Sequence, residues 1–508
     1  MFCRTSLLLS VTVYLIVDGS NIDGPKHGKV VVCYLMSSAM LRKPPVKFEI
    51  SDIDPTLCTH IFYLFPGLDG ELYSNTSVDQ WLDIEQYSGN TGYKNLTGIK
   101  KSYPHIKVIL SLRVWNEDTA KFSKMAGNRW ERFEFITSVM QYLEKYEFDG
   151  LDIMWQYPTM RYPTMRGRTP EDKENFVTLI KELKEAFLPY GYILSASLSN
   201  TREIMSSAYD LVNMNRYLDL IYVLGNDYSG PWHRTVGASA PLRGLNKPDD
   251  RNVEYTIKYL LSFGISPDKL VLAIQFIGHT FILRESDVKN IEFGKTKVEK
   301  FAFSGPYING NYMYGYNEVC LELKNNSKWV YHWDRESSTP YLRHGRRIIT
   351  YDDTRSIANK VKLAIEYNLA GFMAWSINTD DFKGLCDMPN DTYTDFTVRF
   401  NDITKDKFWQ DSSKSPSTQT DSEGNGYGYL RNKQILGLKQ NTFRNYPLLR
   451  TINEAIYMSL KEKKIIDAIN LAITSLKEQE YEPNIGDYSD KQTCEKTCSQ
   501  VCYYGSGD

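Results

Sequence analysis

The stretch Phe148-Asp149-Gly150-Leu151-Asp152-Ile153-Met154-Trp155-Gln156-Tyr157-Pro158 has the composition of a short buried strand that runs into a loop. Two carboxylates, Asp149 and Asp152, stand among its apolar residues. A buried carboxylate costs free energy unless it is paired or hydrogen-bonded. The two aspartates therefore indicate either a structural network that holds a strand end or the wall of an active site. The stretch alone does not separate these two interpretations.

Short apolar runs of the same kind recur on both sides of this stretch. We predict strands at residues 29–36, 59–65, 106–114, 192–198, 218–224, 269–276 and 371–377. Segments with the 3.6-residue apolar period of a helix separate several of them, for example residues 132–147. Strands that alternate with helices predict an α/β protein built on a (β/α)8 TIM barrel. Active sites of such barrels lie at the carboxyl ends of the strands, where the opening stretch ends.

Composition predicts the domain order. Residues 1–20 have the basic start and short apolar run of a signal peptide, and residues 21–405 form the barrel. The connection before the last strand is about 90 residues, which is long enough to hold a small α+β insertion at about 285–350. Residues 406–428 are rich in Ser, Asp, Gly and Thr, as linkers are. Residues 429–508 form a helical C-terminal extension, in which two amphipathic patterns between 446 and 480 allow a helical hairpin.

Charge and hydropathy exclude two classes of function. The 508 residues carry 60 basic and 62 acidic side chains, so the chain has no electrostatic footprint for nucleic acid. Beyond the leader, no apolar run is long enough to predict a membrane span. The histidines are scattered, and neither a metal-ligand spacing nor a Ser/His/Asp pattern is present, so we predict no cofactor and no metal. We expect a secreted, extracellular protein.

Secretion makes disulfides and glycans expected. Of the eight cysteines, Cys3 leaves with the leader, and an odd number remains, which indicates a free thiol or a bridge between chains. A disulfide-linked dimer is one hypothesis for the last three cysteines, Cys494, Cys498 and Cys502. Glycosylation sequons stand at Asn75, Asn95, Asn325 and Asn390.

Several stretches resemble the motifs of one enzyme family. VCYL (32–35) and LCTHIFY (57–63) resemble its first two strands, and the opening stretch resembles its fourth-strand signature DGxDxDWEYP. GNDYSGPW (225–232) is similar to its motif MTYDxxGxW, FGISPDKLVLAI (263–274) to the lead into its seventh strand, and GFMAWSINTDDFKGLC (371–386) to its last-strand motif. The resemblance covers residues 29–405 and is to glycoside hydrolase family 18, the chitinase and chitinase-like family. SSAMLRK (37–43), LDIEQY (82–87) and YPHIKVILS (103–111) also resemble the imaginal disc growth factor branch of arthropod chitinase-like proteins.

The resemblance implies a reaction and its residues. Family members cleave chitin with the substrate's own N-acetyl group as nucleophile. The signature glutamic acid protonates the glycosidic oxygen, the third signature aspartate orients the acetamido group, and a tyrosine after the sixth strand hydrogen-bonds that group. The resemblance also implies the disulfides Cys33–Cys58 and Cys320–Cys386. It implies chitin or N-acetylglucosamine oligomers as ligands, with sugar contacts at Trp115, Tyr157, Asp227 and Trp375.

The chain departs from the family at each of these catalytic positions. Gln156 stands in place of the acid, Met154 in place of the orienting aspartate and Asn226 in place of the tyrosine. A carboxamide has no acidic proton to deliver. Asp149 and Asp152 then remain as parts of a degenerate site. Further departures are Arg113 and Val114 for the two glycines of the third-strand motif SxGG, and Ile277 and His279 for a tyrosine and an arginine after strand seven.

Three hypotheses follow from these departures. The leading one is a secreted, catalytically inactive chitinase-like protein, which acts in growth-factor-type signalling through a cell-surface receptor or in matrix or cuticle organisation. The second is a lectin-like protein that binds chitooligosaccharides, against which the bulk of Arg113 and Val114 argues. The third, which we favour least, is a hydrolase that uses the remaining carboxylates Asp149, Asp152 and Asp227.

Overall fold

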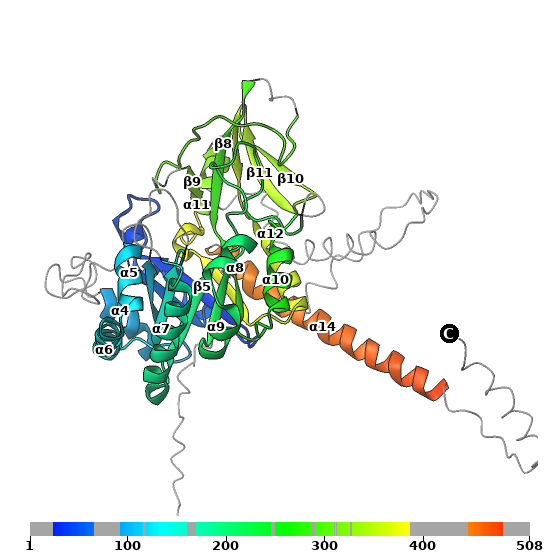
Figure 1. Cartoon of the computed structure of the whole chain (residues 1–508). Coiled ribbons are helices and arrows are strands. Elements are labelled where there is room, and N and C mark those ends of the chain that lie inside the picture. Colours follow the sequence, from blue (N-terminus) through cyan, green and yellow to red (C-terminus); the bar gives the residue numbers. More distant parts are fainter. Residues whose placement is uncertain are drawn as a thin grey trace, which may run out of the picture. The chain divides into compact units, whose positions relative to one another are not determined.

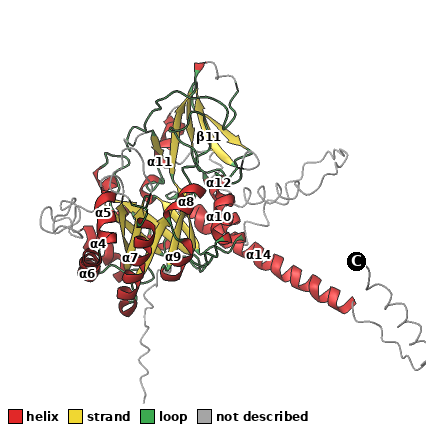
Figure 2. Ribbon diagram, in the orientation of Figure 1, coloured by secondary structure: helices red, strands yellow, loops and turns green. Residues whose placement is uncertain are grey.

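Eight parallel strands close into a barrel, and helices cover its outer face (Figures 1 and 2). The computed structural model describes residues 24–65, 92–114, 118–159, 169–244, 249–285, 290–308, 310, 312–325, 328–386 and 445–480. The predicted (β/α)8 barrel is confirmed, and each predicted strand overlaps an observed one. In barrel order the strands are β1 (Val30–Met36), β13 (Gly371–Trp375), β7 (Leu270–Gln275), β6 (Leu220–Leu224), β5 (Ile193–Leu198), β4 (Gly150–Trp155), β3 (Lys107–Val114) and β2 (His60–Phe65).

Alternation along the strands divides side chains between the barrel interior and the helical layer, because successive residues of a strand point to opposite faces. On β4, Trp155 points outward, where its ring lies 4.8 Å from that of Phe122 and 5.3 Å from that of Phe176. The outer helices are α4 (Gly92–Gly98), α5 (Asp118–Gly127), α6 (Arg129–Tyr146), α7 (Asp172–Phe187), α8 (Arg202–Ala208), α9 (Leu211–Tyr217), α10 (Val253–Ser262) and α12 (Thr354–Glu366).

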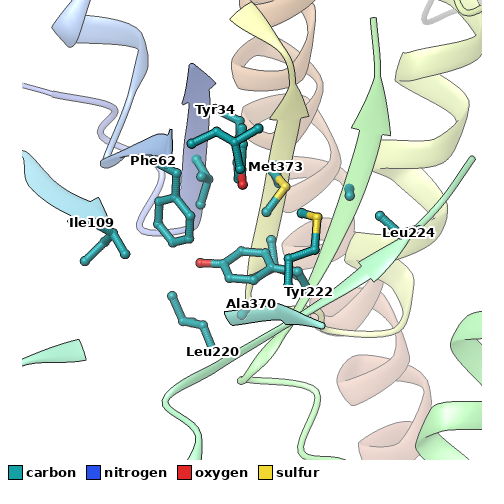
Figure 3. Packing of buried hydrophobic residues seen from close by; sticks show 13 residues of the cluster. Tyr34, Phe62, Ile109, Leu220, Tyr222, Leu224, Ala370 and Met373 are labelled. Carbon is teal, nitrogen blue, oxygen red and sulfur yellow. The ribbon is translucent and has the colours of Figure 1, made fainter. Parts of the chain in front are cut away.

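An apolar cluster fills the interior of the barrel. Figure 3 shows Tyr34, Phe62, Tyr222 and Met373 converging from β1, β2, β6 and β13. The rings of Phe62 and Tyr222 meet edge to face with centroids 5.2 Å apart. Met154 belongs to the same cluster and is 1% exposed. Full burial of side chains of this size stabilises the fold by about 1.5–3 kcal/mol each.

Close contact between β4 and β5 explains the glycine of the opening stretch. A Cβ atom on Gly150 would lie 2.0 Å from the carbonyl oxygen of Ile193. No side chain fits at that distance, so glycine is required where the two strands pair.

A second, antiparallel sheet forms the predicted insertion between β7 and β13, and it gathers at one end of the barrel in Figure 1. It begins at Ile277, earlier than the predicted start near 285, because only Phe276 separates it from β7. The predicted disulfide Cys320–Cys386 joins the insertion to the segment after β13, and the predicted disulfide Cys33–Cys58 is also present. In sheet order the strands are β10 (Val330–Asp334), β11 (Thr339–His344), β12 (Arg347–Thr350), β8 (Ile277–Ile282) and β9 (Met313–Gly315), with the helix α11 (Tyr316–Asn325) after β9.

The C-terminal helical patterns form one continuous helix, α14 (Pro447–Glu480), rather than a hairpin. Its first turns pack on the barrel, where Leu448, Ile452 and Ile456 are fully buried. The compact unit that contains the barrel reaches Tyr457, so these turns supply the helix that follows the eighth barrel strand. The predicted signal peptide, the barrel end at 405, the linker at 406–428 and the cysteines Cys494, Cys498 and Cys502 lie outside the described residues.

Carboxylate groups hold the start of α14. The buried Asp380 side chain accepts the backbone N–H groups of Leu448 at 3.3 Å and Leu449 at 2.9 Å. Arg450 bonds to Asp54 at 3.0 Å on the same helix face. The two bonds to Asp380 satisfy backbone N–H groups that a helix start leaves without intrahelical partners. Across the described part of the chain, none of the helices combines the length and apolarity that crossing a bilayer requires.

We predict that Asp380→Ala destabilises the protein by about 2–3 kcal/mol, because it leaves buried N–H groups of α14 without an acceptor. Urea unfolding measures this loss, and hydrogen exchange at residues 447–457 locates it. Asp467→Ala removes an exposed carboxylate from the same helix and is the control. Equal stability of the two variants would contradict the capping role.

Candidate functional site

The candidate site is the mouth of the barrel, by which we mean the carboxyl ends of its strands and the residues that directly follow them. The opening stretch leaves β4 at this mouth, so Gln156 and Tyr157 are its first loop residues there. Arg113 ends β3 beside Met154 in register, and Trp375 ends β13. Asn226 and Asp227 follow β6. The structure thus gathers residues from four segments of the sequence.

Asp152 lies one inward position below the mouth, inside the barrel, where it is fully buried. Its carboxylate accepts hydrogen bonds from the Ser111 hydroxyl at 2.6 Å and the Ser195 hydroxyl at 2.9 Å. Tyr34 and Ser111 also share a hydrogen bond of 2.5 Å. Burial raises the pKa of Asp152 to about 6, although the two serine hydroxyls oppose that rise. Asp152 therefore binds together β3, β4 and β5 beneath the mouth.

Met154 and Gln156 occupy the next two alternate positions of the same stretch. Met154 packs in the apolar cluster of the barrel, with Trp375 partly buried against that cluster. Gln156 is half-buried at the mouth, and its backbone N–H donates to the carbonyl of Val114 at 3.1 Å. The two positions contribute a thioether and an amide, and neither group can release a proton near neutral pH.

Asp227 is the centre of a hydrogen-bonded group on the β6 side of the mouth. Its carboxylate lies 2.7 Å from Nε2 of the fully buried His279. Burial alone would raise the pKa of Asp227, but the hydrogen bond and charge interaction with His279 lower it, helped by the amides of Asn226 and Gln275. The net shift is downward, so Asp227 is an ionised carboxylate at neutral pH.

Asn226 is almost completely buried beside Asp227 and leaves its Oδ1 atom without a hydrogen-bond partner. Its backbone carbonyl accepts from the side-chain amide of Asn200. The backbone carbonyl of Asn226 thus joins the β6 loop to the segment that follows β5, and its side-chain amide supports Asp227.

Arg113 is the next-to-last residue of β3, in register with Met154 of β4. Its guanidinium interacts electrostatically with Tyr34 of β1, Tyr157 after β4 and Asp227 after β6. Burial lowers the pKa of Arg113, against the raising effect of these neighbours.

Trp375 gives the mouth an aromatic floor. Its indole ring is partly buried, and its centroid lies 4.4 Å from the ring of the buried Tyr34. Flat, partly exposed aromatic rings supply contact area with little loss of conformational entropy on binding. Tyr157 lies near the same mouth, with its ring 6.5 Å from that of Tyr209.

The remaining predicted residues lie elsewhere. Asp149 precedes β4 at the amino end of the barrel strands, so it is far from the mouth, and it accepts from the Val108 N–H at 2.8 Å and from Lys100 at 3.1 Å. Asn95 and Asn325 are exposed on α4 and α11. Trp115, Asn75 and Asn390 lie outside the described residues.

Metal-ligand geometry arises in the described residues at Cys320, Asp381 and Cys386, whose ligand atoms lie within 4.8 Å of one another. The two sulfur atoms are joined in a disulfide, so they are not available as thiolate ligands.

Sequence reasoning missed the pairings inside the site. It noted that His279 departs from the family pattern but did not foresee its bond to Asp227, and it did not name Ser111, Ser195 or Gln275. A signal for the serines existed, because Ser111 and Ser195 stand in register with Asp152 on the two neighbouring strands. Residues in register on adjacent parallel strands share a face of the sheet.

The fold and the site together define a class: a (β/α)8 barrel with a glycosidase-type mouth, in which Met154 and Gln156 stand at two of the four acidic positions of the signature. The model of the family "Glycosyl hydrolases family 18" matches residues 30–380, and the chain belongs to this family. The resemblance inferred from the motifs is therefore confirmed at the level of the family.

Known proteins agree with this placement. The chain is 37% identical over 464 residues to "Probable chitinase 2" of Drosophila melanogaster, covering 90% of this chain and 86% of that protein. Its structure resembles the Ostrinia furnacalis Group IV chitinase in complex with allosamidin, with a TM-score of 0.68, 31% identity, and coverage of 85% and 99%. It also resembles YKL-39 solved in the presence of chitooligosaccharides, with a TM-score of 0.62, 28% identity, and coverage of 70% and 95%.

We predict that Asp152 makes the protein less stable as pH rises from 4 to 6. The folded state binds the Asp152 proton more tightly than the unfolded state, because the pKa is raised from 3.8 to about 6. Stability is therefore lost as this proton leaves, by up to about 3 kcal/mol. Asp152→Asn, whose amide can still bond both serines, should flatten that part of the profile.

Urea unfolding of both proteins at pH 4, 5, 6 and 7 measures the difference. Asp380, whose pKa is raised to about 7 by burial, adds a slope of the same sign to both proteins and cancels in the comparison. Parallel profiles would show that Asp152 does not carry this dependence.

Proposed function

We propose that the chain is a secreted chitinase-like protein that does not hydrolyse chitin. The observation that carries this proposal is the pair of residues at the β4 end of the mouth. Met154 is packed into the apolar interior of the barrel, and Gln156 carries an amide. The family resemblance places an orienting carboxylate and a catalytic acid at these two positions. General acid catalysis typically contributes about 10²–10⁴-fold to the rate.

The carboxylates that remain near the mouth are poorly suited to replace the lost acid. Asp152 has a raised pKa but is fully buried, and both of its oxygens accept serine hydroxyls. Asp227 is partly exposed, but the lowered pKa leaves it without a proton to donate. A general acid needs both reach and a pKa near the working pH, and each of these two groups lacks one of them.

For such an inactive barrel we propose a function in signalling or in the organisation of matrix or cuticle. In signalling, its partner is a cell-surface receptor. The motif resemblances to the imaginal disc growth factor branch at 37–43 and 103–111 support this proposal. Secretion follows from the leader-like residues 1–20, and a disulfide-linked dimer through Cys494, Cys498 and Cys502 remains a further proposal.

Saccharide binding without hydrolysis is a second candidate function, and the aromatic floor favours it. Trp375 presents a partly exposed indole braced by Tyr34. The similar YKL-39 structure was solved in the presence of chitooligosaccharides, which supports a retained saccharide site in this chain.

We predict that the wild-type protein shows no turnover of a fluorogenic chitotrioside. The variant Met154→Asp, Gln156→Glu, Asn226→Tyr should gain measurable turnover, because it restores the acid, the orienting carboxylate and the tyrosine that the family resemblance implies. Adding Arg113→Gly should raise the rate further, since it removes a cation from beside the restored acid.

Lys107→Glu is the matched control. It introduces one carboxylate at the first residue of β3, at the other end of the barrel strands, and should stay inactive. Turnover that co-purifies with the wild-type protein and is abolished by allosamidin would contradict the proposal that the barrel is inactive.

We also predict that insect cells release the protein into the medium with N-glycans on the exposed Asn95 and Asn325. Asn95→Gln and Asn325→Gln should each remove one glycan, which an electrophoretic shift before and after PNGase F digestion detects. Asn470→Gln, an exposed asparagine outside any sequon, should leave the mobility unchanged. Retention inside the cell with no PNGase-sensitive species would refute the secretory route.

A further inference from the structure

The second half of α14 carries a row of exposed isoleucines. The compact unit that contains the barrel ends at Tyr457, so this half of the helix belongs to the second unit. Ile465, Ile466 and Ile469 are 54%, 48% and 53% exposed. Isoleucine is among the residues most often buried in folded proteins. Apolar side chains that gather on one exposed helix face therefore indicate a surface for another molecule.

Spacing along the helix identifies the kind of surface. Ile466 and Ile469 are three residues apart, and the sequence continues with Ile473 four residues later and Leu476 three residues after that. This alternation of three and four is that of the a and d positions of a heptad, along which two helices pair in a coiled coil. Ile465 falls on the g position and widens the apolar face. We call residues 465, 466, 469, 473 and 476 the seam of α14.

The seam fits the same helix of a second copy of this chain. Two identical copies present the same apolar surface to each other, and a pair related by a two-fold axis is self-complementary. Residues on the e and g positions set the orientation of such a pair. Lys463 and Lys477 both fall on e positions, which antiparallel pairing brings together. Parallel pairing sets e against g, where Met458, Ile465 and Ala472 stand, so like charges do not meet.

The sequence beyond the seam supports the same partner. Cys494, Cys498 and Cys502 follow it, in a chain whose number of cysteines after the leader is odd. Parallel pairing of the seam brings the equal-numbered residues of two tails together and raises the effective concentration of their thiols. A short seam gains most from such a tie, because isolated short helices are only marginally stable in water.

We propose that α14 pairs in parallel with α14 of a second copy of this chain, and that Ile465, Ile466 and Ile469 form the contact. This inference deepens the proposed disulfide-linked dimer, because it assigns the surface on which the two copies meet. The contact is noncovalent, so it does not require the tail cysteines. It also holds whether or not the barrel hydrolyses chitin.

Sedimentation equilibrium of the full chain tests the contact. The tail-serine variant, Cys494→Ser, Cys498→Ser, Cys502→Ser, cannot form the covalent bridge. It should still show a monomer–dimer equilibrium in which the dimer fraction rises with protein concentration. The barrel disulfides Cys33–Cys58 and Cys320–Cys386 are kept in this variant, which a reductant would not ensure.

Substitutions in the seam should weaken the dimer. Ile466→Gln with Ile469→Gln, added to the tail-serine variant, should raise the dissociation constant about tenfold or more, because both copies lose two apolar side chains from the contact. Glutamine has at least the helix propensity of isoleucine, so the helix is kept. Leu471→Gln is the matched control. It removes an exposed aliphatic side chain from the opposite face of the same helix and should leave the equilibrium unchanged.

Cross-linking tests the orientation and carries the test if the glutamine variant loses its helix in circular dichroism. In the tail-serine variant, Ile466→Cys places one thiol on the seam of each copy. Parallel pairing brings these two thiols together, so oxidised glutathione should produce a covalent dimer on a non-reducing gel. Leu471→Cys places the thiol on the opposite face and should give monomer under the same conditions.

Three results would overturn the proposal: a tail-serine variant that is monomeric at every concentration, a dimer that the glutamine substitutions leave intact, or equal cross-linking of Ile466→Cys and Leu471→Cys. A monomer that binds phosphatidylcholine vesicles through the seam also overturns it, since the partner is then a lipid surface. A covalent dimer of the chain with its tail cysteines, unaffected by the glutamine substitutions, would keep the proposed disulfide and refute the seam. Chitotrioside turnover stays a separate measurement, because it bears only on the inactive barrel.

Discussion

The hydrogen bonds that enclose Asp152 are the constraint on which the site depends. A carboxylate at the centre of an apolar barrel is tolerated only with its oxygens satisfied, and Ser111 and Ser195 satisfy them from the two neighbouring strands. These bonds link β3, β4 and β5 in one register. Once Asp152 is fixed pointing inward, the alternation of the strand makes Met154 the next inward side chain and directs Trp155 into the helical layer.

The residues at the substituted positions make contacts of their own within the barrel. Met154 joins the apolar cluster beneath Trp375, so no uncompensated polar group is left where the signature has a carboxylate. On the opposite side, His279 reaches Asp227 at 2.7 Å and keeps that carboxylate paired. The Asp227 side chain is partly exposed, so this paired carboxylate also keeps access to water. Met154 and Asp227 thus both have partners in the folded barrel.

The fold could be predicted from the sequence because its signals are local. Each barrel strand is a short apolar run, and the helix at 132–147 shows its period within its own residues. The short helices α8 and α9 have seven residues each and too few turns to show a period. The site was harder, because Asp227 and His279 are 52 residues apart and meet only after the barrel closes. Asp149 and Asp152 look alike in sequence. Asp149, however, precedes β4 at the amino end of the barrel strands, whereas Asp152 points into the barrel interior.

Arg113 places a cation on β3 in register with Met154 of β4. An opposite charge nearby favours the ionised form of a carboxyl group and lowers its pKa. A glutamic acid at position 156 would stand beside Tyr157, with which the Arg113 guanidinium interacts electrostatically. It would be held ionised and would serve poorly as an acid. The neutral amide of Gln156 avoids this interaction, so the substitutions at positions 113, 154 and 156 are electrostatically consistent with one another.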